Sequence, residues 1–352
     1  MANPVIAAID LGYGHTKYSV QTAGTNSEDS FPSYAPTVAA GSTSLGSNSA
    51  LSKLRVVQVE VNQKTYLVGT DAHMATDGRM ERHRDPAYCT TDAYHALTLA
   101  ALSYMHQPVI DVLVLGLPLS TLQTYNKLIE QRYTGRQAVP ASHTLGLDSG
   151  PTTIDVKRVL VVPQPAGALL SLTQDHPDLT DRNTTNLVID IGYYTMDFLC
   201  TRGLRPLLAR SGAVEGGMAS FYDALHAATA AAYAKANPDL TGEFRMSHES
   251  YETAIRRGKL LRTSAGTVDL GEPMRLAALQ MDQFLDAVAA KIGNTDDILN
   301  VILAGGGAEI LAPRFKARFP RMRNILVPEN PQFAIVRGYI AAGQSLAAGV
   351  VK

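Results

Sequence analysis

The chain has 352 residues, about twice the usual length of a single domain, so two domains are expected. Its 31 basic and 32 acidic residues give a formal net charge of −1, which argues against direct sequence-specific binding of nucleic acid, because such binding needs clustered Lys and Arg in excess. The two cysteines, Cys89 and Cys200, lie far apart in the sequence, which excludes a disulfide framework and a CxxC-type metal site.

The ends of the sequence predict its location. Residues 1–14 lack the basic region and the long apolar stretch of a secretion signal. The apolar run at 339–351 is too short to span a bilayer and is rich in Ala and Gly. We therefore expect a cytoplasmic protein that does not contact a membrane. A basic cluster at 314–323 fits a solvated helix face or a local patch for nucleic acid, and the solvated face is favoured.

The first predicted element is a β-hairpin at residues 7–20, AAIDLGYGHTKYSV, in which an apolar strand ends at Asp10 and a Gly-containing turn leads to a second strand. A loop rich in Ser and Gly at 41–52 follows, and then two strands within 54–69 joined at Asn62-Gln63. The next expected elements are a helix at 91–106, a buried strand at 109–118, a helix from about Ser120, a strand at 154–162 and a short helix after 163–167.

The second half of the sequence echoes the first. After a polar linker at 175–185, residues 187–200 read LVIDIGYYTMDFLC and align without gaps on the first hairpin, Asp10 on Asp190 and Gly12 on Gly192. The later expected elements are a strand near 204–210, an Ala-rich helix from about 215, a helix at 252–261, a long helix at 273–292, a strand at 300–307 and a helix from about 332. This pattern predicts an α/β protein of two domains on one plan, with chance similarity of two hairpins as the alternative.

The first hairpin predicts a phosphate-binding turn. Gly12 and Gly14 let backbone amides approach an anion, and Thr16 and Lys17 add a hydroxyl group and a positive charge. Asp10 would repel phosphate, so it is expected to face Mg²⁺ through water. A DxGxG sequence also forms ordinary tight turns, and the motif by itself leaves both interpretations open.

Two later segments strengthen the nucleotide interpretation. Asp190 gives the second hairpin a carboxylate in the same setting as the first, and two such carboxylates facing each other across a cleft repel unless a cation lies between them. Gly305-Gly306-Gly307 follows a buried strand and opens a helix, which lets a flat ring or a phosphate approach the backbone. The alternatives are two aspartates that cap turns and a common strand-to-helix turn.

Five motifs in order resemble the actin/Hsp70/sugar-kinase superfamily. Its two phosphate motifs match 10–17 and 188–198, its two connecting motifs match VPQPAGAL at 162–169 and NPQFAIVRGYIAAG at 330–343, and its adenosine motif matches ILAGGGAEIL at 302–311. DLGYGHTK, FPSYAP at 31–36 and VLGLPLS at 114–120 are similar to bacterial ParM/StbA-type plasmid-segregation actins. Tyr193-Tyr194-Thr195 looks most similar to the PRTRC system protein D group among them.

The resemblance implies an actin-like ATPase fold, α/β in class, with two similar RNase H-like domains flanking a nucleotide cleft. Domain I would cover 1–175 with a small inserted subdomain at about 35–75, and domain II would cover 176–331. A C-terminal helix at 332–352 would return to domain I.

The resemblance also implies a site for ATP or GTP with Mg²⁺. Asp10 and Asp190 would organise the metal and its waters, and Gln164 would orient the attacking water, since an amide is no strong base. A plain loop residue is the alternative for Gln164. The residues expected to contact phosphate are Gly12, Tyr13, Gly14, His15, Thr16, Lys17, Gly192, Tyr193, Tyr194 and Thr195. Those expected near the nucleoside are Glu215, Gly216, Gly217, Glu252, Arg256, Gly305, Gly306 and Gly307, and a surface ion pair between Glu252 and Arg256 fits equally well.

One departure from the family pattern concerns Tyr193 and Tyr194, which replace small residues of its second phosphate loop. They either crowd the phosphate and slow hydrolysis or point into the domain core. The implied function is ATP hydrolysis coupled to polymerisation into dynamic filaments, which would segregate plasmid DNA through a DNA-binding adaptor protein. The alternatives are a small-molecule, sugar-type kinase, for which we find no additional catalytic Asp, a chaperone-type ATPase, and a nucleotide-binding protein with weak hydrolysis.

Overall fold

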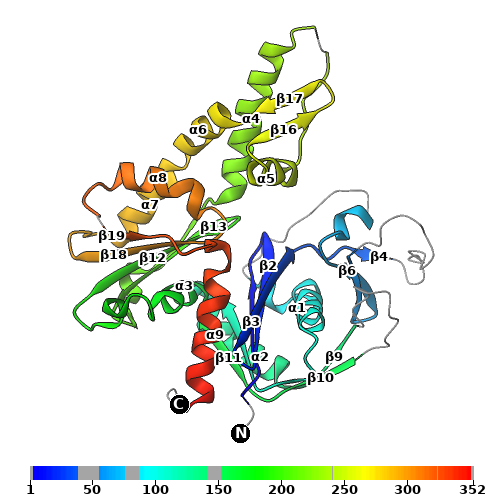
Figure 1. The fold of residues 1–352 in the computed structure, drawn as a ribbon, viewed down its shortest axis with the longest axis vertical. Helices are drawn as coiled ribbons and strands as arrows, with labels where there is room; N and C mark the ends of the chain where they lie inside the picture. The colour runs from blue at the N-terminus through cyan, green and yellow to red at the C-terminus, as the bar shows by residue number, and fades with distance from the viewer. Residues whose placement is uncertain are drawn as a thin grey trace. The chain divides into compact units, whose positions relative to one another are not determined.

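The computed structural model describes residues 3–38, 55–75, 87–140, 152–239, 241–322 and 324–349. The loop predicted at 41–52 lies outside these residues. The chain divides into two compact units, the first formed by Met1–Thr180 with Pro328–Lys352 and the second by Asp181–Val327. Figure 1 labels their elements. Within the described residues, no helix has both the length and the apolar character that crossing a bilayer requires.

The first unit is built on a five-stranded sheet in the order β11-β8-β1-β2-β3, of which Figure 1 labels β2, β3 and β11. β1 (Ile6–Leu11) and β2 (His15–Thr22) form the predicted hairpin, and β3 (Thr25–Pro32) pairs antiparallel with β2. β8 (Val112–Leu117) runs parallel to β1, and β11 (Val159–Pro163) runs parallel to β8. β1 and β8 are buried along their whole length, as expected for central strands covered on both faces.

Two small sheets accompany the large one. The first has the order β4-β6-β5, with β4 (Thr37–Val38), β6 (Lys64–Val68) and β5 (Val57–Val61), and the second has the order β7-β10-β9, with β7 (Val109–Ile110), β10 (Thr152–Val156) and β9 (Gly135–Val139). The turn predicted at Asn62-Gln63 is confirmed, because both residues have positive φ, 48° and 63°. The single strand predicted at 154–162 is wrong: β10 and β11 belong to different sheets, because the backbone changes partners at Lys157-Arg158.

The helices of the first unit are α1 (Asp92–Tyr104), α2 (Leu119–Tyr133), α3 (Gln164–Leu172) and α9 (Ala334–Ala347), with short 3₁₀ turns η1 (Ala72–Ala75), η2 (Tyr88–Thr90), η3 (Pro177–Thr180) and η5 (Pro331–Phe333). α3 and α9 pack backbone to backbone: a Cβ added to Gly338 would lie 1.7 Å from the carbonyl oxygen of Gly167. This close approach, which glycine permits, fastens α3 to α9.

The second unit repeats the sheet plan in the order β14-β13-β12-β18-β19, with β15 also pairing with β13. Its strands are β12 (Thr185–Ile191), β13 (Thr195–Arg202), β14 (Arg205–Pro206), β15 (Gly212–Glu215), β18 (Ile298–Ala304) and β19 (Asn324–Leu326). β12 pairs antiparallel with β13 and parallel with β18, just as β1 pairs with β2 and β8. The echo in the sequence therefore reflects one sheet plan used twice.

The helices of the second unit are α4 (Met218–Ala236), α5 (His248–Arg256), α6 (Gly271–Gln280), α7 (Asp282–Ile292) and α8 (Ala308–Arg318), and β16 (Leu260–Thr263) and β17 (Gly266–Asp269) form a separate hairpin. The single long helix predicted at 273–292 is wrong, because the chain turns at Met281, whose side chain is fully buried. The strand predicted near 204–210 consists of the short β14 and a 3₁₀ turn, η4 (Leu208–Arg210).

Two arginines of the basic cluster at 314–323, Arg314 and Arg318, lie on α8 and form ion pairs. Arg314 on α8 bonds Asp282, and Arg318 on α8 bonds Asp286 at 2.7 Å. These acidic partners lie on α7 of the same unit. These two arginines are thus paired within their own unit, which favours a solvated helix face, and Arg323 lies outside the described residues.

Candidate functional site

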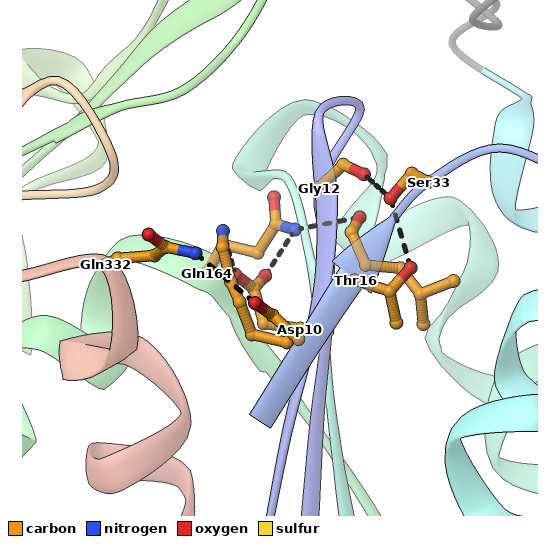
Figure 2. Close-up of polar contacts among 9 residues, drawn as sticks. Asp10, Gly12, Thr16, Ser33, Gln164 and Gln332 are labelled. Atoms are coloured by element: carbon orange, nitrogen blue, oxygen red, sulfur yellow. Dashed lines mark hydrogen bonds and ion pairs between the residues drawn. The ribbon is translucent and has the colours of Figure 1, made fainter. Parts of the chain in front are cut away.

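The centre of the first candidate site is Asp10, near the end of β1. Its side chain is buried, with 1% of its surface exposed, and both carboxylate oxygens receive a hydrogen bond. Lys17 Nζ lies 3.0 Å from Oδ2, because β2 places Lys17 directly opposite Asp10 in the hairpin. Gln164 Nε2 donates to Oδ1 at 2.9 Å (Figure 2). A buried charge is tolerated only when it is paired and hydrogen-bonded in this way.

Gln164 is the first residue of α3 and follows β11 directly. Pro163 and Pro165 flank it, and the fixed φ of proline suits a sharp change from strand to helix. The side chain is 7% exposed and also lies 3.4 Å from the carbonyl oxygen of Leu11. Gln164 is therefore a buried helix residue turned onto Asp10, and the alternative of a loop residue does not hold.

Ser33, which directly follows β3 and was not among the predicted site residues, braces the turn of the first hairpin. The Ser33 hydroxyl donates to the carbonyl oxygen of Gly12 at 2.5 Å and lies 3.0 Å from the hydroxyl of Thr16, as Figure 2 shows. Its backbone amide donates to the carbonyl oxygen of Gly14 at 3.0 Å. Thr16 is fully buried, so its hydroxyl serves this internal brace. The signal for Ser33 was its place in FPSYAP, directly after β3.

The remaining predicted residues of this turn lie on either side of it. Tyr13 stacks on Tyr88 with ring centroids 5.5 Å apart and packs against the core of the unit. His15 opens β2 and pairs with Pro32. Gln332 of η5, near the C-terminal end of the chain, donates to the hydroxyl of Ser30 on β3 at 3.4 Å (Figure 2). The backbone of the turn, rather than these side chains, is the part suited to an anion.

The second candidate site has a different charge pattern. Asp190 on β12 lies directly opposite Asp197 on β13, at the register where the first hairpin pairs Asp10 with Lys17. Asp197 is 6% exposed and accepts a hydrogen bond of 2.7 Å from the hydroxyl of Thr195. Opposed carboxylates on neighbouring strands repel each other, and a cation relieves the repulsion. Asp197 was not among the predicted site residues, although the ungapped alignment of the hairpins places it on Lys17.

Glycines gather around Asp190. Gly305 has a φ of 86°, and a Cβ at that position would lie 2.4 Å from Asp190 Oδ1. A Cβ at Gly217 would lie 2.4 Å from the carbonyl oxygen of Gly192, and one at Gly307 would lie 2.4 Å from Cγ2 of Ile191. A Cβ at Gly306, in contrast, would meet no atom within 4 Å. Three of the predicted glycines, Gly217, Gly305 and Gly307, therefore crowd the second hairpin, where no larger residue fits.

The side chain of Tyr193 packs against the hydrophobic core of the second unit. Its hydroxyl lies 2.6 Å from His248 Nδ1, and its ring meets that of Tyr194 edge to face at 4.8 Å. Of the two orientations left open by the sequence, the core orientation is found for Tyr193. Glu215 ends β15 opposite Thr195, and a Cβ at Gly216 would strike the ring of Phe284 at 2.0 Å.

Glu252 and Arg256 form an ion pair of 2.7 Å along α5, four residues apart. Their geometry is that of an ordinary helix-surface pair. The same helix begins at His248, so the pair lies one and two turns beyond the residue that contacts Tyr193. Helix α5 thus connects Glu252 and Arg256, which the sequence predicts to lie near the nucleoside, to the second hairpin.

A sheet plan used twice, with an acidic hairpin at the centre of each sheet, is the fold of actin-like ATPases. A family model described as actin like proteins N terminal domain matches residues 8–167, and one described as archaeal actin homologue MreB-like, C-terminal, matches residues 188–317. Together they span most of the sequence, including both hairpins. The chain belongs to the actin-like protein family.

Solved structures of this fold match almost the whole chain. An archaeal actin homologue, Ta0583, has a TM-score of 0.73 at 20% identity over 98% of this chain and 100% of its own. The ParM filament from Clostridium botulinum has a TM-score of 0.71 at 21% identity over 97% and 99%. The archaeal homologue in complex with ADP has a TM-score of 0.70 at 18% identity over 96% and 98%. A comparison with curated protein sequences finds no match.

Proposed function

We propose that this chain is an ATPase that binds Mg·ATP through both acidic hairpins and polymerises into filaments. The observation that carries the proposal is the hydrogen-bonded group of Asp10, Lys17 and Gln164 at the end of a central strand. The same strand position in the second unit holds Asp190. An acidic residue, a cation and an oriented amide beside a glycine turn are the parts that phosphoryl-transfer sites require.

The residues present fit a magnesium nucleotide. Asp10, Asp190 and Asp197 offer the hard oxygen ligands that Mg²⁺ or its bound waters prefer. The glycine turn at Gly12 would receive a phosphate, and Lys17 Nζ lies 3.5 Å from the point where a Cβ on Gly12 would stand. When bound, Mg²⁺ would neutralise the charge that develops on the phosphate oxygens. The ADP complex of the archaeal homologue supports the choice of an adenine nucleotide.

Gln164 would orient the attacking water. Because its Nε2 donates to Asp10, its Oε1 remains the acceptor for a proton of that water. An amide holds a water without removing a proton from it, so catalysis would come from positioning and charge neutralisation. The core orientation of Tyr193 supports hydrolysis over the alternative of a protein that binds nucleotide and scarcely turns it over.

The filament part of the proposal is supported by the ParM structures among the solved relatives, one of which is a filament. Nucleotide that binds one conformation better than another shifts the population toward that conformation, and hydrolysis reverses the shift. Such a cycle would drive assembly and disassembly. With a net charge of −1, the chain would reach plasmid DNA through a DNA-binding adaptor protein rather than directly.

Phosphate release and filament pelleting with ATP, GTP, ADP and no nucleotide test the proposal, followed by negative-stain microscopy. We expect turnover and filaments with a triphosphate, and loss of turnover in Asp190→Ala. Asp286→Ala, which removes a surface carboxylate paired with Arg318, is the matched control and should behave as wild type. A chain that stays monomeric at tens of micromolar with every nucleotide would contradict polymerisation. Transfer of phosphate to a sugar would support the kinase alternative.

A further inference from the structure

A series of hydrogen bonds connects the second hairpin turn to helix α5. The Tyr193 hydroxyl lies 2.6 Å from His248 Nδ1, and His248 Nε2 lies 3.0 Å from Asp223 Oδ1. Tyr193 belongs to the turn between β12 and β13, His248 is the first residue of α5, and Asp223 lies on α4. Three separate elements of one unit thus meet at the imidazole ring.

The chemistry of the partners fixes the protons in this series. A carboxylate only accepts hydrogen bonds, so the Nε2 atom of His248 must carry the proton that it shares with Asp223. In the neutral ring, Nδ1 then accepts the hydrogen bond of the Tyr193 hydroxyl. The Asp223 side chain is 73% exposed and that of His248 is 24% exposed, so the inner bond to Tyr193 is the better shielded of the two.

The same helix face that begins with His248 continues to Glu252 and Arg256. These three residues are spaced four apart and therefore lie in one row along α5. Tyr251 and Ala254, between them, face the core of the unit. The turn that carries Tyr193 thus contacts His248 at one end of this row, and Glu252 and Arg256 lie further along the same helix.

We propose that Tyr193, His248 and Asp223 are positioning residues that hold the Glu252 and Arg256 row at a fixed place relative to the second phosphate turn. The inference rests on the proposed function, with the phosphates at the turn, and on the expectation from the sequence that the nucleoside lies near Glu252 and Arg256. A tyrosine at position 193, where a small residue is usual, then has a purpose: it ties the phosphate end of the site to its nucleoside end. Binding of the nucleoside depends on this connection.

The chain offers a matched control in a second tyrosine and histidine pair. Tyr251 of α5 lies 3.0 Å from His226 Nδ1 of α4 and is fully buried. This pair also fastens α5, yet neither residue belongs to the phosphate turn. Tyr251→Phe removes one hydroxyl from α5, as Tyr193→Phe removes one from the turn, and both variants keep the ring.

The test compares the Kd of Mg·ATP with that of Mg·tripolyphosphate, which lacks the nucleoside. In Tyr193→Phe and His248→Ala we expect ATP to bind about ten-fold more weakly, the effect of one lost hydrogen bond, and tripolyphosphate to bind within about two-fold of wild type. His248→Gln should keep wild-type affinity for ATP, because the glutamine amide can accept from Tyr193 and donate to Asp223. Tyr251→Phe should leave both affinities unchanged. If tripolyphosphate binds too weakly to measure, the ATP affinities of His248→Gln and His248→Ala are compared instead. Wild-type affinity in His248→Gln with weaker binding in His248→Ala supports the inference, and equal affinities overturn it.

Each other outcome overturns a distinct statement. A wild-type chain that binds neither ligand refutes the proposed function, and the inference falls with it. Wild-type affinity for ATP in Tyr193→Phe overturns the inference and leaves the proposed function standing. An equal loss for ATP and tripolyphosphate also overturns it, because the series would then only shape the phosphate turn. Circular dichroism checks folding, and if His248→Ala does not fold, Tyr193→Phe removes the same bond by deleting one oxygen atom.

Discussion

Gln164 donates a hydrogen bond of 2.9 Å to Asp10 across 154 positions of sequence. The sheet produces this contact, because β11, which ends directly before Gln164, and β1, which carries Asp10, both pair in parallel with β8. The carboxyl ends of parallel strands lie at one edge of a sheet, where ligands of open α/β folds bind. The other oxygen of Asp10 is taken by Lys17, so the amide of Gln164 has a fixed direction.

Replacement of this amide should separate hydrolysis from binding. We expect Gln164→Ala to lower the rate of ATP hydrolysis by about 100-fold, because alanine cannot orient a water molecule. The Kd of ATP should change by less than about three-fold, since the pair of Asp10 and Lys17 remains. Single-turnover phosphate release and equilibrium binding measure the two quantities. Gln332→Ala, which removes a second glutamine from the same corner, should leave hydrolysis within about two-fold, and a variant of Gln164 that loses ATP binding as well would disprove the separation.

Removal of the Ser33 hydroxyl should loosen the first phosphate turn. That hydroxyl is shared between Gly12 and Thr16 in a buried place, so Ser33→Ala leaves their polar groups without it. We expect the free energy of unfolding to fall by about 1–2 kcal/mol and ATP to bind more weakly. Urea denaturation and ATP titration measure these effects. Ser30→Ala, three residues earlier and on β3, should cost less than about 0.5 kcal/mol, and equal costs at the two serines would show that the brace is unimportant.

Adjacent glycines at 305 and 306 should respond oppositely to alanine. Gly305→Ala combines a positive φ with a Cβ only 2.4 Å from the Asp190 carboxylate, and we expect a loss of about 2 kcal/mol or more in stability together with the loss of ATP binding. Gly306→Ala meets no atom within 4 Å and should stay within about 0.5 kcal/mol of wild type. Thermal unfolding and nucleotide titration of both variants give the comparison. A tolerated Gly305→Ala would mean that Asp190 moves freely and is not held by the turn.

The main sheet strands were predictable because their signals are local. An apolar run that ends in Asp and a glycine turn marks the hairpins at β1 and β12, and Asn62-Gln63 marks the turn between β5 and β6. The order of the five motifs along the chain gave more information about the site than any single motif did. It indicated that Asp10 and Gln164 act in one site, and the hydrogen bond between them shows that they are in contact.

The features that were missed depend on tertiary packing. Nothing in the sequence marks the break at Met281, where no Gly or Pro occurs and the side chain is fully buried. Ser33 looks like any loop serine until β3 brings it against Gly12. The direction of the Tyr193 ring was undecidable, because its partner His248 lies 55 residues away. The roles of these single side chains could therefore be assigned only from the tertiary contacts that the fold creates.

His95 on α1 should make stability depend on pH below neutrality. Burial, followed by the nearby Arg132, lowers the pKa of His95 from 6.5 to about 4, and its Nδ1 lies 3.2 Å from the buried hydroxyl of Tyr133. Between these pKa values the unfolded chain binds a proton that the folded chain does not, so acid favours unfolding. The contribution of a neutral His95 to stability is complete above about pH 7 and is lost as the pH falls toward 4. Urea denaturation of wild type and His95→Gln from about pH 7 to pH 4.5 should show wild type losing about 2 kcal/mol more than the variant, whereas parallel pH profiles would assign the acid sensitivity to other groups.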